Sequence, residues 1–151
     1  MIEKVLSGGQ TGVDRAALDA ARAAKIAIGG WCPRGRRAED GAIPEQYPLS
    51  ETPSADYAQR TEWNVRDADG TLILKRGAIE GGTALTLRVA SQWGKPCLII
   101  DLDDPPSAKV VVDWLAEDGI RVLNIAGPRE AQRPGLYIEA LEFLGAVFSV
   151  I

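Results

Sequence analysis

Short runs of isoleucine, leucine and valine alternate along this chain with longer segments in which apolar residues recur at helical spacing. The apolar runs predict strands over residues 2–6, 26–32, 71–74, 97–102 and 122–126. The helical spacing predicts helices over residues 12–24, 54–67, 84–93, 107–118 and 134–144, and residues 147–151 are expected to form an edge strand or coil. Because strands that alternate with helices are typical of a mostly parallel sheet, we expect a three-layer α/β sandwich with helices on both faces of the sheet.

Small polar residues mark the expected starts of three helices. Thr11 and the aspartate three residues later resemble a capping box, while Ser54 and Thr83 are expected to cap the second and third helices. Residues 33–53 show no periodicity, and a run of this length inside a compact domain is usually functional or mobile.

Composition and charge narrow the functional classes. The 151 residues are 46% hydrophobic and 25% charged, as expected for one globular domain spanning residues 1–151. A net charge of −4 argues against nucleic acid as a partner, and no apolar run is long enough for a membrane span. With no histidine and only two cysteines, we expect no structural metal, no disulfide framework and a cytoplasmic location. Residues 1–4 lead directly into the first strand, so no signal peptide or anchor is expected.

A glycine turn, Ser7–Arg15 (SGGQTGVDR), follows the first predicted strand and precedes an alanine-rich helix. Such a turn directs backbone N–H groups and the positive end of the helix dipole at one point, where a phosphate can bind. It is not a dinucleotide fingerprint, because Ser7 replaces the first glycine, and not a P-loop, because Val13 replaces the lysine. The alternative is that the glycines only make a tight turn. We favour phosphate binding and expect Gly9→Val to abolish it while leaving the fold largely intact.

A second glycine turn, Glu80–Thr83, also precedes a predicted helix and repeats this arrangement. Alone it would be an ordinary loop, but with the first turn it can form the opposite wall of a cleft. Arg34, Arg36 and Arg37 follow the second predicted strand at the same edge of the sheet. Arginine offers bidentate hydrogen bonds to phosphate, although the two acidic residues that follow could neutralise these side chains instead.

The helix predicted over residues 54–67 carries a polar stripe. Tyr57, Arg60, Thr61 and Asn64 lie three or four residues apart and therefore share one face. Such a stripe is usually a solvated surface.

Five segments are spread along most of the chain: SGGQTGVDRAA (7–17), GGWCPRGRRAEDG (29–41), RTEWNVRD (60–67), GGT (81–83) and NIAGPRE (124–130). They resemble the bacterial family named "putative molybdenum carrier", a circularly permuted, YpsA-like branch of the SLOG superfamily of Rossmann-like nucleotide-binding proteins. The resemblance implies a Rossmann-like domain that forms homo-oligomers, dimers or tetramers, and binds a phosphate-bearing small molecule. That ligand would be molybdenum cofactor (molybdopterin), which is a pterin with a phosphate tail, or a nucleotide.

We therefore expect a carrier protein that holds such a ligand at its glycine loops. The expected ligand-binding residues are Gly8, Gly9, Gln10, Thr11, Gly12, Arg34, Arg36, Arg37, Asn64, Gly81, Gly82, Thr83 and Asp101.

The sequence is also compatible with two functions other than a carrier. One is an enzyme that hydrolyses the N-glycosidic bond of a nucleotide, as phosphoribohydrolases of the superfamily do, and the other is a nucleotide-sensing module. No nucleophile with an adjacent general base follows from the spacing, so catalytic residues are unknown apart from the candidate acids Asp14 and Glu62. In those hydrolases a glutamate follows the glycine motif, and here the sequence Ala84–Arg88 lacks it.

Overall fold

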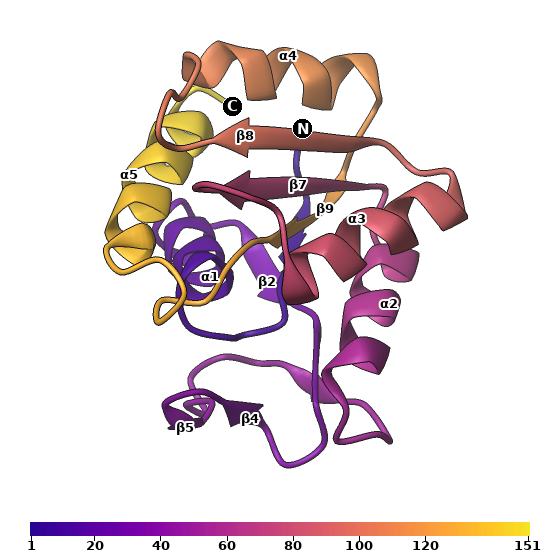
Figure 1. The fold of residues 1–151 in the computed structure, drawn as a ribbon. Helices are drawn as coiled ribbons and strands as arrows, with labels where there is room; N and C mark the ends of the chain where they lie inside the picture. Colours follow the sequence, from indigo (N-terminus) through magenta and orange to yellow (C-terminus); the bar gives the residue numbers. More distant parts are fainter.

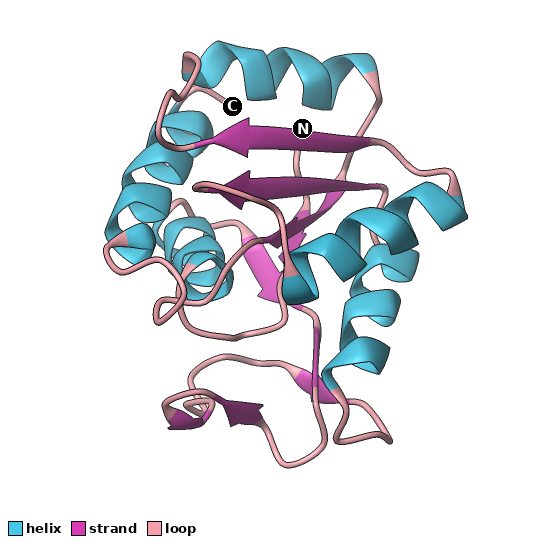
Figure 2. Cartoon of the chain, in the orientation of Figure 1, coloured by secondary structure: helices cyan, strands magenta, loops and turns pink.

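The computed structural model describes residues 1–151, and a sheet of five parallel strands forms its centre (Figures 1 and 2). The strands are β1 (Lys4–Leu6), β2 (Ala27–Gly29), β7 (Gly70–Lys75), β8 (Cys97–Asp101) and β9 (Val122–Ala126), in the order β2-β1-β9-β7-β8. In this register, Val5 of β1 pairs with Ile28 of β2 on one side and Leu123 of β9 on the other. All five strands run parallel, which confirms the predicted α/β architecture.

Helices cover both faces of this sheet (Figure 1). One face carries α1 (Val13–Ala23), α4 (Ala108–Glu117) and α5 (Leu136–Ser149), and the other carries α2 (Tyr57–Asp67) and α3 (Gly81–Trp93). The main apolar core lies under the first group, where the alanines of α1 allow close packing against α5 and the sheet. None of the five helices combines the length and the apolar character that crossing a bilayer requires.

The end of the chain differs from the prediction. Helix α5 continues to Ser149, so most of the segment 147–151 is helical rather than an edge strand or coil. Val147 and Phe148 are buried in the main core together with Leu144. Helical spacing places these side chains on one face, and their burial extends the helix beyond the predicted end.

The predicted strand over residues 26–32 is broken at Gly30. Its backbone has a positive φ of 126°, and an added Cβ would lie only 2.4 Å from the carbonyl oxygen of Ser7. β2 therefore ends at Gly29, and β3 (Trp31–Cys32) leaves the main sheet to pair with β6 (Ser50–Glu51).

Residues 30–56 form a small lobe beside the main sheet, which Figure 1 shows below it. Besides β3 and β6, the lobe contains a short hairpin of β4 (Arg37–Ala38) and β5 (Gly41–Ala42). A separate apolar cluster holds it against α1, formed by Leu18, Cys32, Ile43, Tyr47 and Leu49. The aperiodic part of the sequence is thus ordered around a small core of its own.

Two helix starts also differ from the predicted caps. Asp56, rather than Ser54, caps α2 by accepting a 3.2 Å hydrogen bond from the N–H of Ala58. α3 begins at Gly81 with Glu80 at the N-cap position, and no side chain caps it. Thr83 lies inside the first turn of α3 instead of ahead of it.

Candidate functional site

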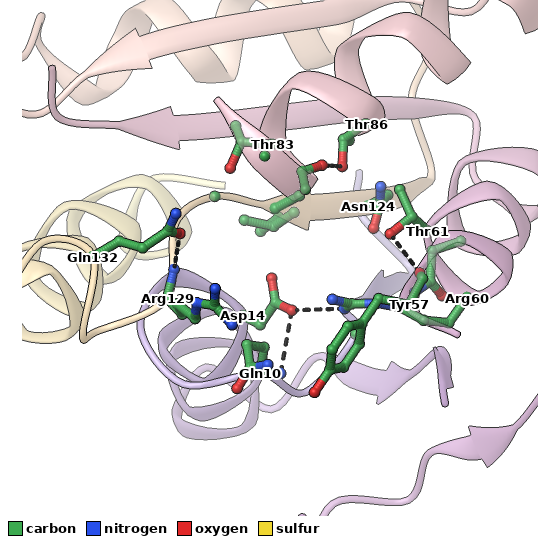
Figure 3. Close-up of a pocket in the computed structure, with 17 residues that line it drawn as sticks. Gln10, Asp14, Tyr57, Arg60, Thr61, Thr83, Thr86, Asn124, Arg129 and Gln132 are labelled. Atoms are coloured by element: carbon green, nitrogen blue, oxygen red, sulfur yellow. Dashed lines mark hydrogen bonds and ion pairs between the residues drawn. The ribbon is translucent and has the colours of Figure 1, made fainter. Parts of the chain in front are cut away.

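A polar pocket of about 190 Å³ lies at the carboxyl ends of β1, β7 and β9 (Figure 3). The chain runs outward from β1 to β2 on one side and from β7 to β8 on the other, so this is the topological switch point of the sheet. Only three of the 17 lining residues are hydrophobic. The predicted residues that line it are Gly8, Gln10, Asn64, Gly81, Gly82 and Thr83.

The two glycine turns face each other across this pocket, as the sequence predicts. Gln10 lies on one wall and Thr83 on the opposite wall (Figure 3). The two walls nevertheless differ in the state of their backbone N–H groups.

On the first wall three backbone N–H groups, those of Gly9, Gln10 and Thr11, are already paired within the protein. Gly9 donates to Ser7 Oγ at 3.2 Å, Gln10 donates to Asp14 Oδ2 at 3.2 Å, and Thr11 donates to Gln10 Oε1 at 3.1 Å. Only the Gln10 amide thus binds an acidic group, and that group is the protein's own Asp14 carboxyl. The sequence predicts free amides at Gly8, Gly9, Thr11 and Gly12. The amides of Gly9 and Thr11 are paired, whereas those of Gly8 and Gly12 make no hydrogen bond within the protein, and of these two residues only Gly8 lines the pocket.

Gly9 and Gly12 instead allow close packing outside the pocket. Both have positive φ values, 76° and 78°. An added Cβ would lie 2.5 Å from Leu49 Cδ1 at Gly9 and 2.5 Å from the carbonyl oxygen of Pro128 at Gly12. The hydroxyl of Thr11 is not a helix cap, because it accepts a 3.2 Å hydrogen bond from the N–H of Glu130.

A buried ion pair forms the floor of the pocket. Arg60 Nη1 lies 3.1 Å from Asp14 Oδ2, and the two side chains are only 14% and 6% exposed. Gly8 makes room for this pair, since an added Cβ would lie 1.7 Å from Arg60 Nη1. Burial raises the pKa of Asp14 above its ordinary value, and the Arg60 charge opposes this effect only in part.

Each partner of this pair keeps one unused polar atom. Arg60 Nε is buried and has no hydrogen-bond partner. Asp14 uses only Oδ2, while Oδ1 makes no hydrogen bond and faces the middle of the pocket (Figure 3). Buried polar atoms are normally paired, so Arg60 Nε is an exception, while Asp14 Oδ1 lies at the cavity and is available to a ligand.

The opposite wall is the start of α3. Because no side chain caps this helix, the first-turn N–H groups of Gly81, Gly82 and Thr83 have no partner from the helix itself. The buried Thr83 hydroxyl makes no hydrogen bond within the protein, whereas Thr86 Oγ1 donates to the Gly82 carbonyl oxygen at 3.0 Å. Free amides and the positive end of the helix dipole make this wall the anion position of the pocket.

The three predicted arginines of the lobe do not line the pocket. The guanidinium of Arg36 donates to four backbone carbonyl oxygens, those of Ile43, Pro44, Tyr47 and Leu49. Arg37 donates to the carbonyl oxygen of Ala55 and lies 5.2 Å from the ring centroid of Tyr57. The exposed side chain of Arg34 makes no hydrogen bond or ion pair.

Two acidic candidates also lie elsewhere. Asp101 is at the end of the edge strand β8, where it pairs with Lys75 at 3.3 Å. Glu62 is exposed on α2 and is not a lining residue, whereas the other candidate acid, Asp14, is.

The polar stripe of α2 is a wall of the pocket, so its interpretation as solvated surface was wrong. Tyr57, Arg60, Thr61 and Asn64 all line the cavity. Asn64 also fixes the lobe, because it accepts from the N–H of Trp31 at 2.8 Å and donates to its carbonyl oxygen at 3.0 Å. Four polar residues on one face of this helix were therefore the sequence pattern from which this wall of the pocket could have been predicted.

Four further polar lining residues were not predicted: Thr86, Asn124, Arg129 and Gln132. Asn124 could have been found, since a polar residue in the middle of a buried apolar strand is unusual. No group of three histidine, cysteine, aspartate or glutamate side chains lies close enough to hold a metal ion.

The fold and the position of this pocket define a Rossmann-like α/β protein with its candidate site at the switch point of a parallel sheet. The chain belongs to the circularly permuted YpsA SLOG family, whose sequence profile matches residues 5–148. It is similar to a crystal structure from Syntrophus aciditrophicus SB named "putative molybdenum carrier protein", with 49% identity and a TM-score of 0.92. That similarity covers 97% of this chain and 94% of the other. Among curated proteins, none matches the chain.

Proposed function

We propose that this protein is a carrier that binds a phosphate-bearing small molecule, molybdenum cofactor or a nucleotide-like ligand, in the pocket between α2 and α3. The observation that carries this proposal is the uncapped start of α3, which faces the unused Oδ1 of Asp14 across the cavity. The name of the similar protein from Syntrophus aciditrophicus supports molybdenum cofactor as the first ligand to test.

In this proposal the phosphate binds at Gly81–Thr83, where backbone amides and the helix dipole favour negative charge. Arg129 lies at the rim, 45% exposed and 3.7 Å from Glu39, and can turn toward the phosphate. The remainder of the ligand would extend toward Asp14 and Asn124.

The donor groups fit an organic cofactor better than a bare metal ion. The lining offers amides, hydroxyls and guanidinium groups, which bind phosphate and polar rings. Neither cysteine is among the lining residues, so the pocket lacks the thiolate ligands that a soft metal prefers. Molybdenum would then travel as cargo, held by the cofactor's own ligands.

A matched pair of variants at Gly82 tests the anion position. A side chain added there meets no atom within 4 Å, and an acidic residue in the first turn of a helix does not destabilise it. We expect Gly82→Glu to lower affinity for AMP and for molybdenum cofactor at least tenfold relative to the uncharged Gly82→Gln, measured by calorimetric titration. Equal affinities in the two variants would exclude the start of α3 as the phosphate site.

A nucleotide hydrolase is the second candidate, favoured by one observation. Asp14 is a buried carboxyl group with a raised pKa and a free oxygen in the pocket, as a general acid requires. Release of free base from AMP that Asp14→Asn abolishes and Glu62→Gln does not would favour the enzyme. Absence of any base release alongside tight binding would favour the carrier.

We also propose that the chain assembles as a homo-oligomer, a dimer or tetramer, as the family resemblance implies. Light scattering coupled to gel filtration tests this directly, and a monomeric mass across the micromolar range would exclude it.

A further inference from the structure

We infer that Asp14 selects the ligand at the end opposite the phosphate: the cargo is a phosphate ester that also carries a hydroxyl or amino group, which donates a hydrogen bond to Asp14 Oδ1. A bare oxyanion such as molybdate or sulfate is correspondingly disfavoured. This inference rests on the proposed function, because it takes the start of α3 as the anion position.

The first argument is the state of the Asp14 carboxyl group. Its side chain is only 6% exposed, and Oδ2 accepts both the N–H of Gln10 and one N–H of Arg60. Oδ1 has no partner and faces the cavity (Figure 3). An ionised carboxyl oxygen only accepts hydrogen bonds, so the group that completes this site is a donor.

The second argument is the charge around the pocket. Arg60 is neutralised by Asp14, and the rim residue Arg129 is paired with Glu39 at 3.7 Å. The Asp14 end therefore offers an anion no unpaired positive charge, whereas α3 presents free amides. The two ends of the cavity thus differ in the chemistry that they accept.

The third argument is size. A cavity of about 190 Å³ is many times the roughly 10–15 Å³ that one water needs on the same measure, so it has room for more than one tetrahedral oxyanion. Molybdate and sulfate carry no proton at neutral pH, so neither can donate to Oδ1 while occupying the α3 end. A phosphate ester with a hydroxyl or amino group can reach both ends.

Calorimetric titration with three probes tests the inference: ribose 5-phosphate, pentyl phosphate and molybdate. Ribose 5-phosphate and pentyl phosphate share a five-carbon phosphate monoester, but only the sugar carries hydroxyl groups. We expect the wild-type protein to bind ribose 5-phosphate at least tenfold more tightly than either other probe. In Asp14→Asn this preference should fall below threefold, with molybdate binding equal or stronger because the charge of Arg60 is then no longer neutralised.

Asp19→Asn is the matched control. Asp19 is also on α1 but lies outside the pocket, where Tyr47 and Tyr137 donate to its carboxylate. This variant should keep the tenfold preference. If Asp14→Asn fails to fold because Arg60 loses its partner, the double variant Asp14→Asn with Arg60→Gln removes both charges and should show the same loss of preference.

The outcomes separate this inference from the proposed function. A tenfold preference that survives in Asp14→Asn, or a wild-type protein that binds pentyl phosphate or molybdate as tightly as ribose 5-phosphate, overturns the role of Asp14 alone. If no phosphate ester binds the wild-type protein, and Gly82→Glu and Gly82→Gln behave alike, the proposed function fails as well.

Discussion

Asp14 and Arg60 bury opposite charges beside a cavity, and each leaves one polar atom unused. Burial of an ion pair is costly unless further hydrogen bonds satisfy both groups. Here the unused oxygen of Asp14, Oδ1, faces the cavity that a ligand would occupy. The pair is therefore better explained as part of a binding site than as a contribution to stability.

This burial makes the stability depend on pH in a specific direction. The pKa of Asp14 is raised in the folded state above its ordinary value of 3.8, so the unfolded chain releases this proton first as pH rises. The stability that Asp14 contributes is complete below about pH 3.8 and is lost as pH rises through the folded pKa. We expect the unfolding free energy of wild type, relative to Asp14→Asn, to decrease from pH 4 toward pH 7 in urea titrations.

The pH dependence due to Asp14 is not obscured by the three aspartates with lowered pKa values, Asp40, Asp67 and Asp101. Their pKa values are lowered by the neighbouring Arg15, Arg66 and Asp103 N–H groups, so they titrate below 3.8 and are common to both proteins. A difference between wild type and Asp14→Asn that is constant with pH would contradict the raised pKa.

Two glycines of the pocket should respond in opposite ways to alanine. Gly8→Ala places a methyl group 1.7 Å from Arg60 Nη1, so the guanidinium must leave Asp14. We expect a loss of about 1–3 kcal/mol in unfolding free energy and weaker ligand binding. Gly82→Ala meets no atom and lies in a helix, so stability should rise by up to about 1 kcal/mol. Urea unfolding of both variants tests this, and equal effects would contradict it.

Single residues of the site were predictable only in part. Gly8, Gln10 and Gly81–Thr83 followed from glycine turns next to helices, because that local pattern has a direct physical meaning. Arg36 was misplaced, because three arginines in four residues give no indication that one will bind backbone carbonyls of its own lobe. Which of two possible anions fills a glycine turn, a ligand or Asp14, depends on side-chain packing that spacing does not encode.

At the scale of elements, buried strands were predicted best. β9 has the predicted limits, Val122–Ala126, because its apolar run is interrupted only by Asn124 and is bounded by Arg121 and Gly127, a pattern typical of a buried strand. β3 was misread as part of β2, since the break depends on a contact between Gly30 and Ser7 that is distant in sequence. Tertiary contacts also extend α5 over a segment whose local composition suits a strand.

The extension of α5 makes a testable claim about the end of the chain. Phe148 is 6% exposed and packs in the main core, whereas Val150, two residues later, is 60% exposed. We expect Phe148→Ala to lower the unfolding free energy by about 3–5 kcal/mol. Val150→Ala should change it by less than about 0.5 kcal/mol. Equal small effects in thermal or urea unfolding would show that the segment does not pack as a core helix.

At the scale of the whole molecule, the lobe of residues 30–56 is attached to the sheet-centred part by specific contacts. Tyr47 of the lobe and Tyr137 of α5 both donate to Asp19 of α1. Gly9 packs against Leu49 of the lobe, so Gly9→Val is now expected to disturb this contact and destabilise the protein. Because the expected effect is on packing, we do not expect this variant to abolish ligand binding while leaving the fold largely intact, which is what the sequence alone predicts.

Arg36 is the internal support of this lobe, and its removal should loosen the lobe without removing the site. Its guanidinium donates to four backbone carbonyl oxygens, together worth roughly 2–4 kcal/mol of local stability. In Arg36→Met we expect faster hydrogen exchange throughout residues 30–56, measured by mass spectrometry, with unchanged exchange in β7 and β9. Affinity for AMP should fall less than threefold, because Arg36 does not line the pocket.

Arg34→Met is the control, because it removes the same charge two residues before Arg36. The Arg34 side chain is exposed and has no hydrogen-bond partner, so this variant should change neither the hydrogen exchange nor the AMP affinity. A large loss of AMP affinity in Arg36→Met with normal exchange in the lobe would mean that this arginine contacts the ligand after all. The same loss in both variants would instead indicate that the overall positive charge of the lobe attracts the anion. We propose that the lobe supports the site while α2 and α3 bind the ligand. This proposal requires that Arg36→Met loosens the lobe without a large loss of AMP affinity, and that Arg34→Met leaves the affinity unchanged.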